Sequence, residues 1–199
     1  MNELKSGYVS IVGKTNAGKS TLLNKILGQK IAITSRKPQT TRHRFLGIKT
    51  EGHNQIIFVD TPGFHTGEKR ALNRYMNKVA SNAMRGVDIV LYVLDSLRWS
   101  EEDLSRIQSI SKETFIILVI NKTDKLEDKN LLLPFIQERS DENIFTNIIP
   151  ISALKGNGVE DLINSIIIKL PHGEHLYPEE QVTDISEKFL ASEVIREKC

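Results

Sequence analysis

The feature that most restricts the fold of this chain is the segment from Gly13 to Ser20, with the sequence GKTNAGKS. It matches the pattern G-x-x-x-x-G-K-[ST], follows an apolar run from Tyr8 to Val12, and precedes apolar residues at helical spacing. A glycine-rich turn between a buried strand and a helix directs successive backbone N–H groups at one anion, and the helix adds the positive end of its dipole. This context predicts a phosphate-binding loop.

The residues of this loop have distinct predicted roles. Gly13 and Gly18 let the backbone curl around the anion. Lys19 is expected to reach the β- and γ-phosphates of a nucleotide, and the Ser20 hydroxyl is expected to bind Mg²⁺. The loop positions predicted to contact the nucleotide are Gly13, Asn16, Ala17, Gly18, Lys19, Ser20 and Thr21.

Short apolar runs alternate with helical patterns along most of the chain. The runs are Tyr8–Val12, Gln55–Asp60, Asp88–Asp95, Thr114–Asn121 and Asn147–Ile151, and the helical stretches are Lys19–Leu27, 69–84, Glu101–Ser111, Asp128–Arg139 and Gly158–Lys169. Such alternation implies right-handed crossovers and a mainly parallel sheet with helices on both faces. Phe45–Lys49 joins Gln55–Asp60 through a short turn with Gly52, which predicts an antiparallel edge strand and an α/β sheet of six strands.

Composition agrees with one well-buried domain and a modest appendage, because the chain has 199 residues, 39% hydrophobic and 26% charged. No apolar run approaches the roughly 18 residues of a membrane span, and Met1–Lys5 leads into a predicted strand without a signal peptide. Cys199 is the only cysteine, which excludes a disulfide framework. We expect a cytoplasmic protein, and with a net charge of +2 any affinity for nucleic acid must come from local patches.

The polar segment from Thr34 to Arg44 contains four Lys or Arg and no acid. Taken alone it is typical of a solvated loop. Next to a phosphate loop, however, a threonine can offer its hydroxyl to Mg²⁺ and its N–H to a γ-phosphate that orders the loop. Thr41 is the first candidate and Thr40 the alternative, and their spacing does not separate them.

The segment Asp60-Thr61-Pro62-Gly63 closes a predicted strand about 40 residues after the phosphate loop. Asp60 can hold Mg²⁺ through its water shell, and the Gly63 N–H can meet the γ-phosphate. Phe64 follows where many GTP-hydrolysing switch proteins have a glutamine that orients the attacking water. A phenylalanine cannot form that hydrogen bond, so slow hydrolysis is expected. The predicted catalytic residues are Lys19, Thr41 and Gly63, and the predicted metal ligands are Ser20, Thr41 and Asp60.

Asn121-Lys122-Thr123-Asp124 predicts which base is bound. The Asp124 carboxylate can accept from N1–H and N2–H₂ of guanine, whereas adenine would leave that charge unpaired. Asn121 is expected to tie this segment to the phosphate loop, and the Lys122 stem can lie over the base. Further along the chain, the tripeptide Ser152-Ala153-Leu154 follows the last predicted strand, where a backbone N–H, first of all that of Ala153, would meet guanine O6.

In this order the motifs resemble the translation-factor class of GTPases, and the finer sequence is similar to the Era-like GTPase family. The similar stretches are Ile33–Arg44, Asp60–His65, Lys69–Arg74, Met76–Lys78, Leu176–Glu179 and Phe189–Lys198. The resemblance extends over essentially the whole chain. The resemblance implies a P-loop NTPase fold of the Ras-like G-domain type that binds GTP and GDP with Mg²⁺.

For function, the resemblance implies slow GTP hydrolysis and assistance in maturation of the small ribosomal subunit, with 16S rRNA contacted through a C-terminal KH domain. It also implies a monomer and, for some members, peripheral association with the inner face of the cell membrane. Two readings stay open, an enzyme and a nucleotide-gated binding module. The alternative family is another GTPase of ribosome assembly or tRNA modification. Asn16 has two interpretations, a K⁺ ligand as in related GTPases or a small turn residue.

The chain departs from this family after residue 169, because only thirty residues follow and none supplies the G-x-x-G loop of a KH domain. We expect a G domain over 1–169, an acidic linker over 170–182 and, over 183–199, the first helix of an incomplete KH domain. Thr183 or Asp184 would cap that helix. Its apolar stripe needs a partner surface; the stripe comprises Ile185, Phe189, Leu190, Val194 and Ile195.

Overall fold

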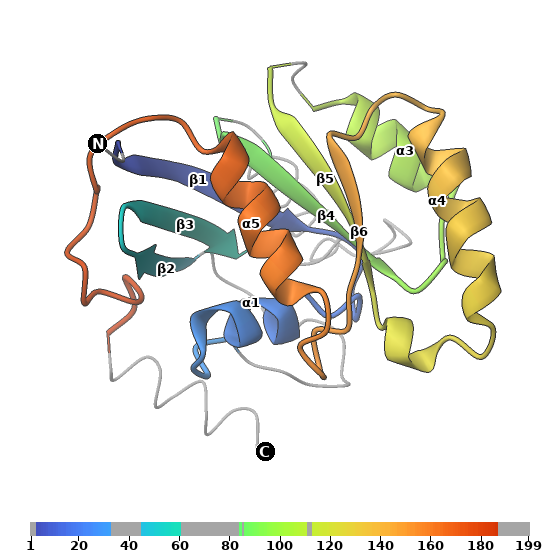
Figure 1. The fold of residues 1–199 in the computed structure, drawn as a ribbon, viewed down its shortest axis with the longest axis horizontal. Coiled ribbons are helices and arrows are strands. Elements are labelled where there is room, and N and C mark those ends of the chain that lie inside the picture. Colours follow the sequence, from blue (N-terminus) through green and yellow to red (C-terminus); the bar gives the residue numbers. More distant parts are fainter. Residues whose placement is uncertain (1–2, 33–44, 61–83, 85, 111–112, 187–199) are drawn as a thin grey trace, which may run out of the picture.

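The computed structural model describes residues 3–32, 45–60, 84, 86–110 and 113–186, and for Asp60 the backbone alone. Its described strands form one sheet of six in the order β2-β3-β1-β4-β5-β6 (Figure 1). The strands are β1 (Lys5–Val12), β2 (Phe45–Glu51), β3 (Asn54–Asp60), β4 (Ile89–Asp95), β5 (Phe115–Asn121) and β6 (Asn147–Pro150). The described helices are α1 (Lys19–Leu27), α3 (Glu101–Gln108), α4 (Leu132–Ser140) and α5 (Val159–Lys169), with 3₁₀ turns at Thr123–Lys125 and Lys129–Leu131.

The predicted α/β architecture is confirmed, including its single antiparallel pair. β2 and β3 form a hairpin in which Phe45 faces Asp60 and Glu51 faces Asn54, and Gly52 makes the turn with φ 56°. Every other described pair in the sheet is parallel. β2 is therefore the edge strand that the short polar turn predicted.

Helices cover both faces of the sheet, which is why β4 is a continuous apolar run. Its odd-numbered residues Ile89, Leu91 and Val93 belong to the same buried cluster as α1 and α5. Its even-numbered residues Val90, Tyr92 and Leu94 belong to a second cluster with Ile107 of α3, and Phe135 of α4 packs against it. The side chains of one strand thus join two hydrophobic cores.

Two predicted helices differ from the structure at their ends. The stretch predicted as Asp128–Arg139 is divided into a 3₁₀ turn and α4. Pro134 explains the division, because its ring is tolerated in the first turn of a helix but would clash with the carbonyl four residues earlier if the helix were continuous. The stretch predicted as Glu101–Ser111 ends at Gln108 as α3. The helix predicted over 69–84 lies outside the described residues, apart from Met84 in the second core.

Residues 170–186, which we call the strap, lie along the sheet (Figure 1). β4 pairs with β1 only from Val9 onward, and the strap takes the place of a strand partner before that point. Pro171 O accepts from Ser6 N at 3.2 Å, and Gly173 N donates to Leu4 O at 3.0 Å. The segment predicted as an acidic linker is therefore hydrogen-bonded to β1 from its beginning.

Gln55 of β3 fixes the middle of the strap. Its side chain is fully buried, and its Oε1 accepts from the backbone nitrogens of Leu176 at 2.8 Å and Tyr177 at 3.0 Å. Its Nε2 donates to Tyr177 O at 2.8 Å and to Thr50 Oγ1 at 3.0 Å. One buried amide thus satisfies three backbone groups of the strap.

The end of the strap is bound to the outer edge of β2. Val182 O accepts from Ile48 N at 2.7 Å, the Thr183 hydroxyl donates to Leu46 O at 2.7 Å, and Asp184 Oδ1 accepts from Leu46 N at 2.8 Å. Thr183 and Asp184, the two predicted helix caps, therefore bond to the β2 backbone, and the helix that they would cap lies outside the described residues. These bonds cover an edge that would otherwise present unpaired groups.

Substituting the central amide tests how much the strap contributes to stability. Gln55→Ala should lower the free energy of unfolding by about 1–3 kcal/mol, because it leaves buried strap groups without partners. The measurement is urea unfolding, with hydrogen exchange at the Leu176 and Tyr177 amides as a local readout. Gln137→Ala is the control, because Gln137 is exposed and makes a hydrogen bond to Asp141 within its own helical turn. Equal losses in both variants would contradict the role of Gln55.

Candidate functional site

The predicted phosphate loop lies at the carboxyl end of β1, in the middle of the sheet. β1 pairs with β3 on one side and β4 on the other, so the chain leaves it toward one half of the sheet and later crosses to the other half. In open parallel sheets, ligands bind outside the carboxyl ends of the strands at such a reversal point. The loops after β4, β5 and β6 meet the phosphate loop at this edge.

The backbone of the loop has a conformation that explains its glycines. Gly13 has φ 147°, Asn16 has φ 63° and Gly18 has φ 98°. A Cβ atom on Gly13 would lie 2.3 Å from Val93 O, and one on Gly18 would lie 2.3 Å from Asn121 Nδ2. Both positions therefore need glycine for space as well as for backbone angle. Because the helix α1 begins at Lys19, directly after Gly18, its amino end has no capping side chain at that position.

Lys19 is almost completely buried in the curl of the loop. Its Nζ donates to Gly13 O at 3.1 Å and to Lys14 O at 2.9 Å. A buried ammonium requires polar partners, and these two loop carbonyls are among the partners of Lys19. An anionic phosphate at the amino end of α1 fits this arrangement, which agrees with the loop's predicted role. Ser20 and Thr21 lie half-buried in the first turn of the same helix.

Asn121 connects three loops of the site, as its predicted role requires. It is buried at the end of β5; its Nδ2 donates to Ala17 O at 2.9 Å, and its Oδ1 accepts from Ala153 N at 3.0 Å. The phosphate loop, the segment 121–124 and the segment 152–154 are thereby held together. The Ala153 N–H, which the sequence assigns to guanine O6, is engaged by Asn121 in this structure.

Lys122 and Asp124, the two side chains predicted to contact the base, are each held by hydrogen bonds. Lys122 Nζ donates to Asn16 O at 2.6 Å and to Asp95 Oδ2 at 2.7 Å. The buried Ser152 hydroxyl donates to Asp124 Oδ1 at 2.6 Å, and this hydrogen bond lowers the pKa of Asp124 below its usual value. Asp124 is therefore an ionised acceptor at neutral pH, as the recognition of guanine N–H groups requires.

For several predicted site residues, the structure describes only the backbone or does not describe the residue. Leu154 is 71% exposed, and only its backbone is suited to a polar contact. Asp60 ends β3, and its side chain is not described. Thr40, Thr41, Gly63 and Phe64 lie outside the described residues. Within the part of the chain that the structure describes, no three His, Cys, Asp or Glu residues are grouped as a metal site.

Two acidic residues at the site were not predicted. Asp95 ends β4 and pairs with Lys122; an acid at the carboxyl end of a buried strand was the signal available in the sequence. Asp103 of α3 is fully buried and binds Lys14 of the phosphate loop at 2.5 Å. Burial alone would raise the pKa of Asp103, but hydrogen bonds from Lys14, Ser100 and Tyr92 outweigh it and hold the pKa below its usual value.

Comparisons with known proteins agree with this site. A family model described as a 50S ribosome-binding GTPase matches residues 8–122, which include the phosphate loop and Asn121. GTPase Era from Azotobacter vinelandii is 54% identical over 200 residues, a match that covers 99% of this chain. The chain belongs to the Era family of GTPases. It spans 66% of the length of that relative and 65% of the Era protein from Ectopseudomonas mendocina, which is 53% identical.

Two crystal structures of Era have the same fold as this chain. One is Era in complex with MgGDPNP and nucleotides 1506–1542 of 16S ribosomal RNA, and the other is an Aquifex aeolicus Era variant bound to GDP·AlF4⁻. Each superimposes with a TM-score of 0.90 at 42% identity, covering 98% of this chain and 67% of the other. The similarity extends past α5, since a match of 98% includes most of the residues after 169.

The contact between Gly18 and Asn121 can be tested by a matched pair of substitutions. Gly18→Ala should lower the free energy of unfolding about 1–3 kcal/mol more than Gly28→Ala does. Both glycines have positive φ, 98° and 71°, so the backbone strain is similar. Only at Gly18 would the added methyl displace the Asn121 amide, because nothing lies within 4 Å of a Cβ on Gly28. Thermal unfolding of both variants provides the comparison, and equal stability would show that the loops tolerate the displacement.

Proposed function

We propose that this chain binds GTP and GDP with Mg²⁺ and hydrolyses GTP slowly, as the nucleotide-binding part of an Era-type switch protein. The proposal rests chiefly on Asn121, whose amide joins the phosphate loop to the segment that contains Ala153. This link gives one site with a phosphate end, built on α1, and a base end, built after β5 and β6. The matches to Era support the same function.

At the phosphate end, the loop residues Gly13–Thr21 would surround the phosphates with backbone N–H groups. Lys19 would exchange part of its contact with loop carbonyls for the β- and γ-phosphate oxygens. We assign Mg²⁺ to Ser20, Asp60 and Thr41, with Thr40 as the alternative to Thr41. The Gly63 N–H would meet the γ-phosphate. MgGDPNP in a related Era crystal structure supports a magnesium nucleotide as the ligand.

At the base end, the Asp124 carboxylate would accept from the two guanine N–H groups. The Ser152 hydroxyl occupies Oδ1 and so fixes the plane of the carboxylate before a base binds. The stem of Lys122 would lie along the base, since its Nζ is held by Asn16 O and Asp95. Guanine O6 would accept a hydrogen bond from a backbone N–H of the tripeptide Ser152-Ala153-Leu154, first of all that of Ala153.

We propose slow intrinsic hydrolysis because Phe64 cannot orient a water molecule. The protein would then act mainly as a switch whose bound state docks on a partner, with hydrolysis resetting it. Related Era has been solved with 16S rRNA nucleotides, which supports the small ribosomal subunit as that partner. The alternative, another ribosome-assembly or tRNA-modification GTPase, is less well supported, because the Era matches cover 98–99% of the chain.

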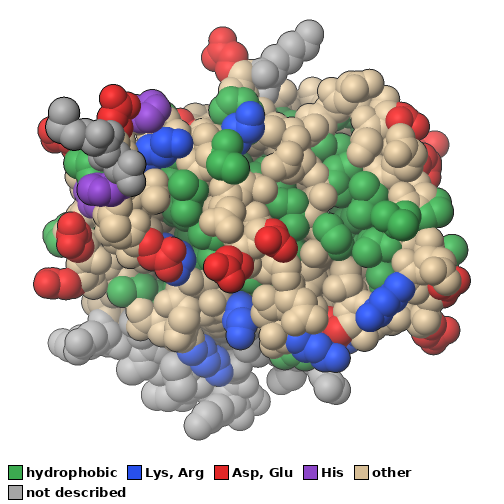
Figure 2. Space-filling view, in the orientation of Figure 1, with side chains coloured by type: hydrophobic (Ala, Val, Ile, Leu, Met, Phe, Trp, Pro, Cys, Tyr) green, Lys and Arg blue, Asp and Glu red, His purple; other side chains and the backbone are tan. Residues whose placement is uncertain are grey.

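We further propose that residues 1–169 form the G domain, that 170–182 connect it onward, and that 183–199 begin a KH domain that reads the RNA. On the face that Figure 2 shows, the Lys and Arg side chains are interspersed with Asp and Glu. None of the described helices is long and apolar enough to cross a membrane. We propose a cytoplasmic protein from its composition, and the family resemblance supports a monomer with peripheral membrane association.

Calorimetric titration tests the proposed guanine site. GDP and GTP should bind with Mg²⁺ and ATP should not, and Asp124→Asn should shift the preference toward xanthine nucleotides, whose base offers an acceptor where guanine has a donor. Asp128→Asn is the matched control, because Asp128 is exposed and its side chain accepts from the nearby Asn130 N. Equal affinity of the unaltered chain for ATP and GTP would refute the proposal.

A second experiment tests whether Asn16 binds potassium. Without a partner, we expect hydrolysis on the order of 10⁻⁴–10⁻² s⁻¹, and a faster rate in K⁺ than in Na⁺ if the ion supplies positive charge beside the phosphates. Asn16→Gly removes the side chain while suiting the positive φ of 63° at that position. The variant should lose the potassium effect. Equal rates of the unaltered chain in the two buffers would leave Asn16 as a turn residue.

A further inference from the structure

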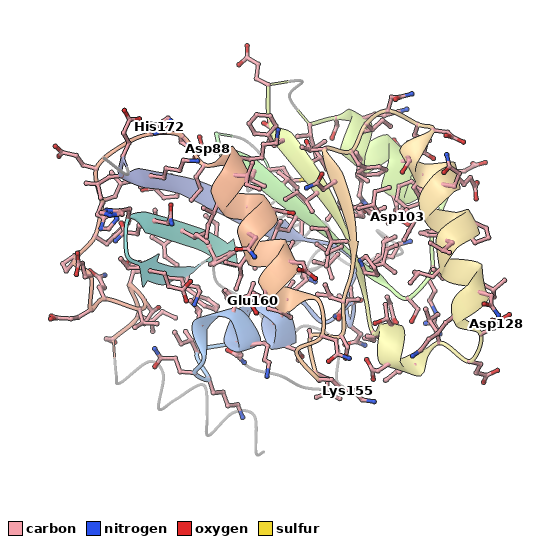
Figure 3. The ribbon with its side chains drawn as sticks, viewed as in Figure 1. Asp88, Asp103, Asp128, Lys155, Glu160 and His172 are labelled. Carbon is pink, nitrogen blue, oxygen red and sulfur yellow. The ribbon has the colours of Figure 1, made fainter. Side chains whose placement is uncertain are left out.

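The contact between Lys14 and Asp103 joins the phosphate loop to α3, 89 residues away along the chain. Asp103 lies where α3 faces the sheet (Figure 3) and has no exposed surface. Its Oδ2 accepts from Lys14 Nζ at 2.5 Å and from Ser100 N at 2.9 Å, and its Oδ1 accepts from Tyr92 OH at 2.8 Å. These donors fix the orientation of the Asp103 carboxylate. The carboxylate in turn fixes the position of the Lys14 ammonium that it binds.

The contacts of Asp103 exceed what the start of α3 needs. Capping that helix requires only the bond from Ser100 N, a local contact three residues away. Tyr92 comes from β4 and Lys14 from the loop after β1, so two further elements converge on one carboxylate. Lys14 Nζ also donates to Ser100 Oγ at 2.8 Å, so that the ammonium is held by two groups of the same helix start.

The backbone of Lys14 is part of the phosphate loop itself. Its carbonyl oxygen accepts from Lys19 Nζ at 2.9 Å and from Ala17 N at 3.3 Å. This carbonyl therefore contributes both to the curl of the loop and to the position of the Lys19 ammonium. Gly13, just before it, has a backbone that could otherwise turn easily. The side chain of Lys14 attaches this residue to the start of α3, outside the loop.

We propose that Asp103 is a positioning residue for nucleotide binding, acting through Lys14 to orient the peptide that holds Lys19. This inference rests on the proposed function of the loop and deepens it. It assigns the Lys14 charge to α3 and away from the ligand, so that Lys19 is the cation that meets the phosphates. Positioning by Asp103 would therefore strengthen contacts with the β- and γ-phosphates, which Lys19 is predicted to reach. It would not affect contacts with guanine or ribose.

Electrostatics alone predicts the opposite result, which makes the inference testable. Asp103→Asn removes a negative charge close to the phosphate loop, and by charge alone it should tighten the binding of an anionic nucleotide. The positioning role predicts weaker binding, because Lys14 loses its ionic partner and its carbonyl is less firmly held. A purely structural role in α3 predicts lower stability with no change in the relative affinities of nucleotides.

The experiment compares GDP with GMP, since the difference between their affinities measures the contribution of the β-phosphate. Calorimetric competition is run on the 199-residue chain and on Asp103→Asn, Lys14→Met and Lys14→Arg. In Asp103→Asn and Lys14→Met, GDP affinity should fall roughly 3–30-fold while GMP affinity stays within about twofold. Lys14→Arg should retain most of the GDP affinity, because a guanidinium can still pair with the buried carboxylate. Glu101→Gln is the control, as an exposed acid in the same turn of α3.

The outcomes separate this inference from the function on which it rests. Failure of the unaltered chain to bind guanine nucleotides would overturn the proposed function. If the unaltered chain binds, unchanged or tighter GDP binding by folded Asp103→Asn overturns the positioning role, and so does an equal loss for GDP and GMP. If Asp103→Asn does not fold, Tyr92→Phe carries the test, because it removes the donor to Asp103 Oδ1 without changing any charge near the loop. Unchanged GDP affinity in Tyr92→Phe would then overturn the positioning role.

Discussion

The amide of Asn121 is the contact on which the geometry of the site depends. Backbone loops at the ends of strands have no hydrogen-bonding ladder to fix them relative to one another. Asn121 supplies that connection because its carbonyl and amino groups face opposite loops, Ala153 on one side and Ala17 on the other. An aspartate could not donate to Ala17 O and a leucine could do neither, so an amide of this length is needed. The separation between the predicted base and phosphate positions therefore depends on this side chain.

The carboxyl ends of the strands and the side of the sheet that the strap covers have different functions. At the carboxyl edge, the loops leave polar groups directed at the predicted ligand, which requires a backbone held in unfavourable angles at Gly13 and Gly18. At the opposite edge, the strap bonds to the backbone of β1 and to the Gln55 side chain of β3, and it then continues along β2. The buried Gln55 there and the buried Asn121 at the site have the same role, since each uses one amide to fix a loop that has no regular secondary structure.

The sequence predicted those parts of the fold that depend on local patterns. The mainly parallel sheet and its hairpin follow from the apolar runs and Gly52, and the link from Asn121 to the phosphate loop follows from the motif to which it belongs. The pairing of Lys14 with Asp103 could not be predicted, because Lys14 occupies a variable position of the motif and its partner is chosen by tertiary packing. The strap was predicted as a linker for a similar reason. Up to Val182 its bonds to the sheet are made by its backbone, so its acidic composition and prolines gave no sign of them.

The attachment of the strap to the sheet limits the volume that a segment following the strap could sample. If residues 170–186 were a flexible tether of seventeen residues, its ends would be separated by about 20–25 Å on average, in any direction. A second body on such a tether would sample a large volume at low effective concentration around the G domain. Bonded to Leu46 and Ile48, the chain instead starts from a fixed point beside β2. The search volume of that second body is then set by the few residues after Asp184 and not by the length of the whole segment.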